Sequence, residues 1–117
     1  MNPAEHDRRI DYIEFPVRSV ADAKRFYGIF GWTFEDYGPD YASFNDGRLN
    51  GGFTTAGTAK TGGVLVVIYA ADLEAMEKKV LQAGGTIVRP TYSFPGGRRF
   101  HFTDPSGNEL AIWSDNS

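Results

Sequence analysis

The residues best suited to chemistry are Tyr12 and Glu14 near the start of the chain and His101, Glu109 and Trp113 near its end. A histidine titrates near neutral pH, a carboxylate can serve as a base or an anchor, and aromatic rings can stack on a ligand. Such a set can bind a polar organic molecule, and Glu14 with His101 could exchange protons with it. Each residue also has a structural explanation, such as a solvated strand carboxylate, a hydrogen-bonded histidine or a tryptophan in a core or dimer interface.

The composition narrows the class of protein. The 117 residues correspond to one domain, with 41% apolar and 15% aromatic residues. The net charge is −3 and basic residues form no cluster larger than a pair, so nucleic acid is not an expected partner. The absence of cysteine excludes disulfides and thiolate metal sites. The longest apolar run, residues 64–71, is too short to cross a bilayer and the polar N-terminus is unlike a signal peptide, so we expect a cytoplasmic protein with no membrane partner.

Alternation and spacing predict where strands and helices lie. Residues 10–17 alternate between apolar and polar side chains, as in a strand with one buried face. Residues 20–31 and 73–84 have apolar residues at helical spacing, each preceded by a residue that can cap a helix. Further strands are predicted at residues 32–38, 41–46, 53–57, 64–70, 86–90, 98–104 and 109–114.

The order of these elements occurs twice. Thr33 and Thr86, which lie at equivalent places in the two halves, are 53 residues apart. We therefore expect two βαβββ modules, residues 10–57 and 63–114, after a flexible arm at residues 1–9. Each module has one helix, which can cover one face of a sheet. The other face must be covered by the sister module, a second chain or a ligand.

Two motifs give the sequence a resemblance to a known family. Residues 26–32 read FYGIFGW after the first predicted helix, and residues 102–108 read FTDPSGN before the last predicted strand. With the paired βαβββ order, they resemble the vicinal oxygen chelate superfamily over residues 10–114. That group contains glyoxalase I, bleomycin resistance proteins and extradiol dioxygenases. The resemblance implies an α+β fold with a cupped mixed sheet, helices on its outer face, a small organic molecule in the cup and pairing as a homodimer.

Enzymes of this superfamily hold a divalent metal through His, Glu or Gln at four strand positions. The resemblance places three of these positions at Tyr12, Leu65 and Ala111, and the fourth within residues 51–54, which include none of those residue types. Leu65 and Ala111 cannot bind a metal, so we expect the family's metal site to be lost. Glu109 shares a strand face with Ala111 but lies about 7 Å along the strand from it.

These observations favour a metal-free protein that binds a small molecule of unknown identity. Tyr12, Glu14, His101, Glu109 and Trp113 are the expected ligand contacts, with no cofactor. The alternative is an enzyme: a glyoxalase-like lyase, isomerase or dioxygenase with a displaced metal on His101, Glu14 and Glu109, or a metal-free enzyme whose catalytic residues are Glu14 and His101. A third possibility is a structural role, with the cup filled by the chain's own side chains.

One basic pair is open to two interpretations. Arg98 and Arg99 follow directly on Gly96 and Gly97. Two guanidinium groups at the mouth of a cavity could bind an anion. Because two glycines favour a turn, a solvated loop is the simpler interpretation. The sequence therefore predicts no functional role for this pair.

Overall fold

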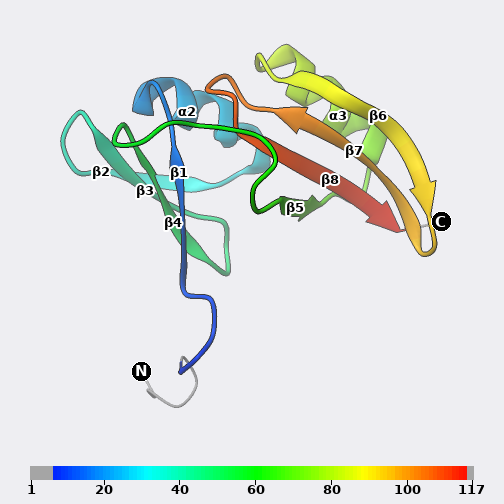
Figure 1. The fold of residues 1–117 in the computed structure, drawn as a ribbon, viewed down its shortest axis with the longest axis horizontal. Helices are drawn as coiled ribbons and strands as arrows, with labels where there is room; N and C mark the ends of the chain where they lie inside the picture. Colours follow the sequence, from blue (N-terminus) through cyan, green and yellow to red (C-terminus); the bar gives the residue numbers. More distant parts are fainter. Residues whose placement is uncertain (1–6, 116–117) are drawn as a thin grey trace.

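A computed structural model describes residues 7–115 and shows two copies of one βαβββ unit (Figure 1). Residues 1–6 of the predicted arm lie outside the described residues. The first unit contains β1 (Tyr12–Pro16), α2 (Val20–Tyr27), the 3₁₀ helix η1 (Gly28–Phe30), β2 (Thr33–Asp36), β3 (Tyr41–Asn45) and β4 (Asn50–Thr54). The second contains β5 (Val66–Tyr69), α3 (Leu73–Gln82), β6 (Thr86–Phe94), β7 (Gly97–Thr103) and β8 (Glu109–Asp115).

Each unit forms its own four-stranded mixed sheet. The strand order is β1-β4-β3-β2 in the first sheet and β5-β8-β7-β6 in the second. The pairs β1–β4 and β5–β8 are parallel, and the remaining neighbours are antiparallel. Equivalent strands occupy equivalent places, so the predicted α+β fold of two βαβββ modules is confirmed.

Both helices begin at side-chain caps. The Ser19 hydroxyl accepts a hydrogen bond from the backbone N–H of Asp22 at 3.1 Å, and the Asp72 carboxylate accepts one from Ala75 at 3.0 Å. The first helix is shorter than predicted, because after Tyr27 the chain tightens into η1. Gly31 ends this turn with a φ of 79°, a left-handed conformation that favours glycine.

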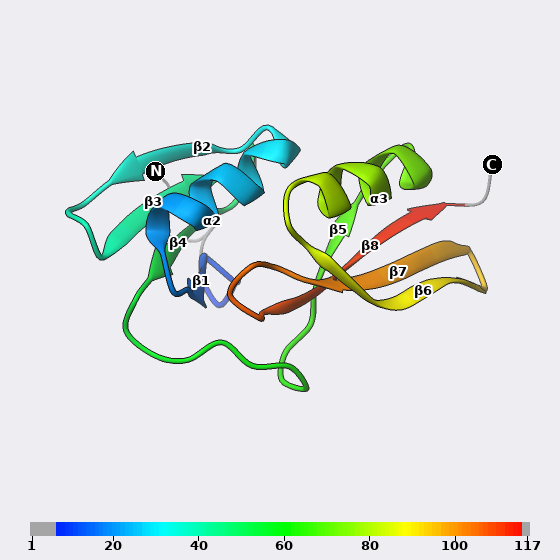
Figure 2. The ribbon, with the colours of Figure 1, turned by 90° about the horizontal axis from the view of Figure 1, so that it is seen from above.

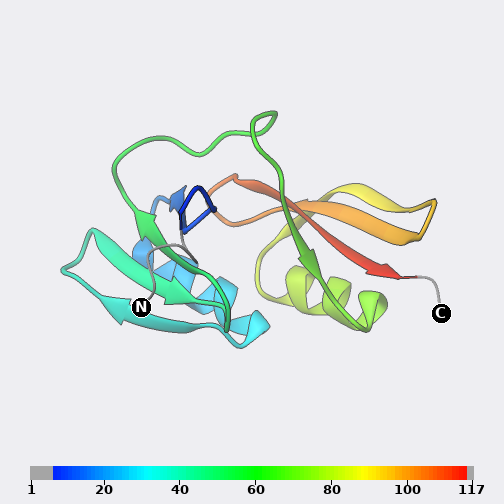
Figure 3. The ribbon, with the colours of Figure 1, turned by 90° about the horizontal axis from the view of Figure 1, so that it is seen from below.

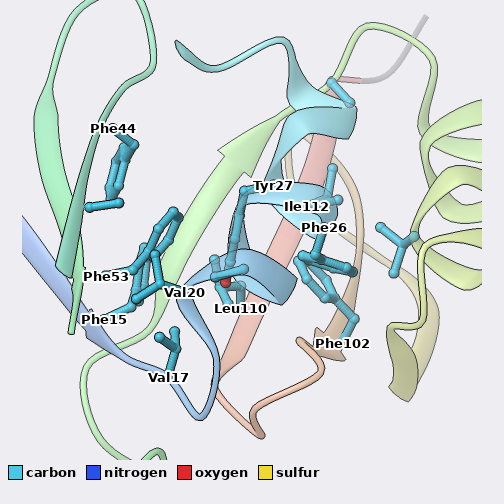
Figure 4. Packing of buried hydrophobic residues seen from close by; sticks show 14 of the residues in the cluster. Phe15, Val17, Val20, Phe26, Tyr27, Phe44, Phe53, Phe102, Leu110 and Ile112 are labelled. Atoms are coloured by element: carbon cyan, nitrogen blue, oxygen red, sulfur yellow. The ribbon is translucent and has the colours of Figure 1, made fainter. Parts of the chain in front are cut away.

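One apolar core joins the two units. Phe15 and Phe53 of the first sheet pack on Tyr27 of α2, whose ring centroid lies 5.1 Å from that of Phe53 (Figure 4). On the other side of the same helix, the ring of Phe26 packs against that of Phe102 of β7, with 5.9 Å between the ring centroids. Figure 2 shows α2 and α3 along one side of the molecule. Helix α2 therefore buries apolar surface against both units.

The turn between β7 and β8 forms hydrogen bonds that connect the two units. One carboxylate oxygen of Asp104 accepts hydrogen bonds from the backbone N–H groups of residues 106–108, each at 2.9 Å. The other accepts the Tyr27 hydroxyl at 2.8 Å. Asn108 donates its side-chain amide to the carbonyl oxygen of Pro16 at 2.8 Å. The sequence singled out residues 102–108 as a motif before the last strand, and the structure shows that this motif holds β1 and α2.

Strand β4 begins three residues earlier than predicted. The sequence suggested a turn up to Gly52, whereas Asn50 already pairs with Tyr12 and Gly51 with Ile13. A Cβ atom on Gly51 would overlap both the Ile13 carbonyl oxygen and the ring of Phe44. Glycine is therefore present here because of close packing inside a sheet.

Strand β6 is longer than predicted. The sequence suggested a strand that ends at Pro90 and a loop after it, but β6 continues to Phe94. Pro90 is tolerated because β6 is an edge strand, where a missing N–H need not break a ladder. Gly96, with a φ of 107°, forms the tight turn into β7. Arg98 and Arg99 therefore lie on β7, as the strand predicted at residues 98–104 has it, and the solvated loop preferred for this pair was wrong.

The linker between the units crosses the side of the molecule opposite the helices. Residues 55–65 contain no helix or strand, and they pass from β4 to β5 in the views of Figures 2 and 3. Within residues 7–115, no helix has the length and apolar character needed to span a membrane.

Candidate functional site

Each sheet has one face that packs on the core and one open face, which is turned away from α2 and α3. The predicted ligand contacts all lie on the open faces, since their strand neighbours point into the core. The first open face carries Tyr12 and Glu14, and the second carries His101, Glu109 and Trp113. No hydrogen bond or ring contact within the described part of the chain joins the two groups. The predicted single site is therefore two clusters in one chain.

The cluster on the first open face is a chain of hydroxyl groups that ends on a carboxylate. The Tyr41 hydroxyl donates to Glu14 at 2.8 Å, so the hydroxyl of Tyr12 donates to Tyr41. Burial raises the pKa of Tyr41, and the hydrogen bonds to Tyr12 and Glu14 raise it further, so its neutral form is favoured. Gly52 lies beneath the hydroxyl groups of Tyr41 and Tyr12, and a Cβ atom at this position would overlap the Tyr41 hydroxyl.

The cluster on the second open face is a longer hydrogen-bonded chain. Arg99 can only donate, and its Nε donates to the Tyr92 hydroxyl oxygen. The Tyr92 hydroxyl can then donate to Nε2 of His101, 3.1 Å away. This leaves the proton of the neutral imidazole on Nδ1, which donates to the Glu109 carboxylate at 2.9 Å. The chain of donors therefore runs in one direction, from Arg99 to Glu109.

Burial and ring contacts hold this cluster in place. The side chain of His101 is 8% exposed and that of Glu109 is 25% exposed. Trp113 lies next to Arg99 at the other end of the cluster, with its ring centroid 5.2 Å from that of Tyr69 in an edge-on contact and 6.3 Å from that of Phe94. The arrangement combines an oriented histidine, a carboxylate and an aromatic surface. Such a combination can recognise a small polar molecule or transfer a proton.

Tyr41, Tyr92 and Arg99 belong to these clusters but were not predicted. Tyr41 of β3 pairs with Thr54 of the neighbouring strand β4, and Tyr92 of β6 pairs with Arg99 of the neighbouring strand β7. Nothing in the local sequence reveals which residues face one another across a sheet. The residues following Pro90 were also placed in a loop, which hid the alternation that puts Tyr92 on the open face.

Four hollows border the clusters. A hollow of about 660 Å³ adjoins Tyr12 on the first sheet. Another of about 230 Å³ adjoins Glu14. A groove of about 570 Å³ runs between the units, lined mainly by apolar side chains and by Trp113. A hollow of about 160 Å³ separates His101 and Glu109 from linker residues 60–65. Of the predicted contacts, only His101 and Glu109 line the same one of these four.

The residues at the positions that the resemblance assigns to the superfamily's metal do not fit a metal. Leu65 and Ala111 have hydrocarbon side chains, and the Tyr12 hydroxyl is hydrogen-bonded to the Tyr41 hydroxyl. Residues 51–54 offer two glycines, a phenylalanine and a threonine. Both ring nitrogens of His101 are already hydrogen-bonded. Within residues 7–115, no group of three or more His, Cys, Asp or Glu side chains could hold a metal ion.

Comparison with known proteins identifies relatives of this fold. A glyoxalase-related enzyme from Fulvimarina pelagi superposes with a TM-score of 0.78, at 20% identity, over 92% of this chain and 88% of that one. An uncharacterised protein of Mycolicibacterium smegmatis is 26% identical, with 92% of this chain and 95% of that protein covered.

A longer relative is the Mycobacterium tuberculosis protein named "Putative glyoxylase CFP32", which is 25% identical over 91% of this chain. The match covers 45% of that relative, so the chain spans less than half its length. The sequence also matches the family described as Glyoxalase/Bleomycin resistance protein/Dioxygenase superfamily over residues 9–112. By this match, and by the two βαβββ units that carry it, the chain belongs to the glyoxalase/bleomycin resistance protein/dioxygenase superfamily.

Proposed function

We propose that this protein binds a small organic molecule on its second open face, through side chains and without a metal. The supporting observation is the hydrogen-bonded chain from Arg99 through Tyr92 and His101 to Glu109, with Trp113 beside it. None of these five side chains belongs to the apolar core within the described residues. These polar groups are already held in position next to an aromatic surface. Less conformational entropy is therefore lost when a ligand binds.

Tyr12 and Glu14 enter the same site in this proposal when two chains pair. In a homodimer, the first open face of one chain could lie against the second open face of its partner. Tyr12 is 43% exposed and Tyr69 is 52% exposed, and pairing would cover both. Large exposed side chains on both open faces support a role for these faces in contact with another molecule.

A screen for ligand-induced stabilisation tests the proposal. The purified protein is melted with a panel of neutral, cationic and anionic metabolites and drugs, together with Ni²⁺, Zn²⁺, Mn²⁺ and Fe²⁺. An organic ligand at about 100 times its Kd should raise the melting temperature by roughly 10 °C. Stabilisation by a stoichiometric metal ion, with none by any organic compound, would contradict the proposal.

Variants then locate the ligand. Trp113→Ala and His101→Ala should each weaken binding of the organic ligand by about tenfold or more, since each removes a direct contact. Leu81→Ala is the control, because Leu81 is 52% exposed on α3 and lies far from either open face in the fold. Unchanged affinity in Trp113→Ala and His101→Ala would place the ligand elsewhere. Weaker binding of the ligand by the Glu14→Gln variant would support a site shared between two chains of a dimer.

An acid–base enzyme is the second candidate, and the contact between His101 and Glu109 favours it. Glu109 orients the Nδ1–H group of His101, which makes Nε2 the proton acceptor, and Tyr92 is the group that donates to it. The structure thus pairs His101 with Glu109 in the same chain, whereas Glu14 would have to come from a partner. Conversion of the bound ligand that survives Glu14→Gln combined with His101→Ala would exclude this candidate.

A further inference from the structure

One row of side chains crosses all four strands of the second open face. Strand register pairs Tyr69 with Trp113, Trp113 with Arg99, and Arg99 with Tyr92. Because directly paired residues project from the same face of a sheet, the row places Arg99 between Trp113 and Tyr92. The Arg99 Cζ lies 5.5 Å from the centre of the Tyr92 ring and 5.9 Å from that of the Phe94 ring. Arg89 adds a second guanidinium, whose Cζ lies 3.7 Å from the centre of the Tyr92 ring.

Both guanidinium groups keep free donors. Arg99 uses Nε for the Tyr92 hydroxyl, and within residues 7–115 neither Arg99 nor Arg89 forms an ion pair. Arg98 differs, because it points to the opposite face and pairs with Glu74 of α3 at 2.6 Å. A guanidinium with two free NH₂ groups can bind a carboxylate through two parallel hydrogen bonds.

Two carboxylates on the same face of β8 already accept hydrogen bonds from other groups. Asp115 accepts the Tyr69 hydroxyl at 2.8 Å, and Glu109 accepts from His101. Neither carboxylate lies within ion-pair distance of Arg99 or Arg89. The two positive charges on this face are therefore left for a group from outside the described chain.

We infer that the ligand is a planar aromatic anion, with its carboxylate on Arg99 and Arg89 and its ring against Trp113. The inference rests on the proposed function and adds the chemical class of the ligand. Arg99 and Trp113 are directly paired neighbours, so a ring and a carboxylate joined by a short link can reach both at once. Arginine gives the anion a geometric preference, and the indole gives the ring a stacking surface.

Matched probes test the charge requirement. Binding of 2-naphthoate, its neutral analogue 2-naphthamide and the ringless anion acetate is measured by titration calorimetry at low salt. We expect 2-naphthoate to bind with a Kd of about 1 mM or tighter. We expect 2-naphthamide to bind about tenfold more weakly, and acetate not to saturate, because each lacks one of the two recognition elements.

Variants separate the two recognition elements. Arg99→Gln and Arg89→Gln should each weaken 2-naphthoate by about tenfold and leave 2-naphthamide unchanged. Trp113→Ala should weaken both aromatic probes. Arg98→Gln is the matched control, because it removes the same charge one residue away on the opposite face, and it should change neither affinity by more than about twofold. Urea unfolding of each variant confirms that it is folded.

Three outcomes would overturn the inference. Equal affinity for 2-naphthoate and 2-naphthamide would remove the anion requirement, and the proposed function would stand if any other organic ligand binds the same face. Loss of 2-naphthoate binding in Arg98→Gln to the same degree as in Arg99→Gln would show a diffuse charge effect. If Arg99→Gln and Arg89→Gln change the particle mass measured by light scattering and leave 2-naphthoate binding intact, these residues instead contact a second copy of the chain.

Discussion

At the scale of single residues, Tyr27 contributes to packing and to hydrogen bonding at once. Its fully buried ring stacks between Phe53 and Trp32, with centroid distances of 5.1 Å to each. Its hydroxyl donates to Asp104 in the turn of the second unit. Burial raises the pKa of Tyr27 well above its usual value, and the charge and hydrogen bond of Asp104 raise it further.

This raised pKa predicts a loss of stability in alkali. In the unfolded chain Tyr27 ionises near pH 10, while in the folded protein it stays neutral. Its contribution is therefore complete below pH 10 and falls above it, by about 1.4 kcal/mol per pH unit until the folded pKa is reached. We expect Tyr27→Phe to destabilise the protein at pH 8, and this destabilisation to shrink by about 1.4 kcal/mol at pH 11. Urea unfolding at both pH values measures it, and an unchanged difference would contradict the assignment.

At the scale of elements, the two consecutive glycines of β4 face different surroundings. Gly51 lies against the Ile13 backbone and the Phe44 ring on the core side, and Gly52 lies under Tyr41 and Tyr12 on the open side. Backbone cannot move aside, whereas the far end of a tyrosine can. The same substitution should therefore have different consequences at the two positions.

Gly51→Ala should destabilise the protein by about 2 kcal/mol or more, because the added methyl overlaps the Ile13 carbonyl in the β1–β4 pair. The control is Gly63→Ala in the linker, where an added Cβ meets nothing within 4 Å. We expect that control to stay within about 0.5 kcal/mol of the parent. Chemical denaturation, fitted with one m-value for all proteins, measures the change in the free energy of unfolding of each variant. Equal effects of the two substitutions would contradict the packing described for β4.

The sequence predicted elements better than it predicted how they pair. Alternation located β1 and β8, and cap residues located both helices, because these signals are local. The alternation also put Glu109 and Trp113 on one face of β8. The partners Tyr41, Tyr92 and Arg99 depend on strand register, which is set by tertiary packing. A glycine pair and Pro90 both suggested chain breaks, whereas the sheets accommodate them by close packing and by an edge position.

At the scale of the whole molecule, the contacts between the units predict that they unfold together. Among the pairs that cross between them are Phe26–Phe102, Tyr27–Asp104, Arg18–Ser106 and Pro16–Asn108. Phe26, Phe102 and Tyr27 belong to one buried core that both units share, so breaking one unit exposes the other. A domain of this size is expected to unfold in one transition when its core is continuous.

Each unit contains one tryptophan, which allows a direct test. Trp113→Phe leaves Trp32 to report on the first unit, and Trp32→Phe leaves Trp113 to report on the second. In each variant, the urea midpoint from tryptophan fluorescence should coincide with the midpoint from circular dichroism. A fluorescence midpoint that departs from the circular dichroism midpoint in either variant would show that the units unfold separately.

Ala111 has a consequence for how the second open face can change. The resemblance to the superfamily predicts a metal position there, and the residue is fully buried on the open side of β8, between His101 and Val67. A glutamate at this position would need room that neighbouring side chains occupy. The chemistry of this face can therefore change more easily through its exposed side chains than through a metal ligand at Ala111.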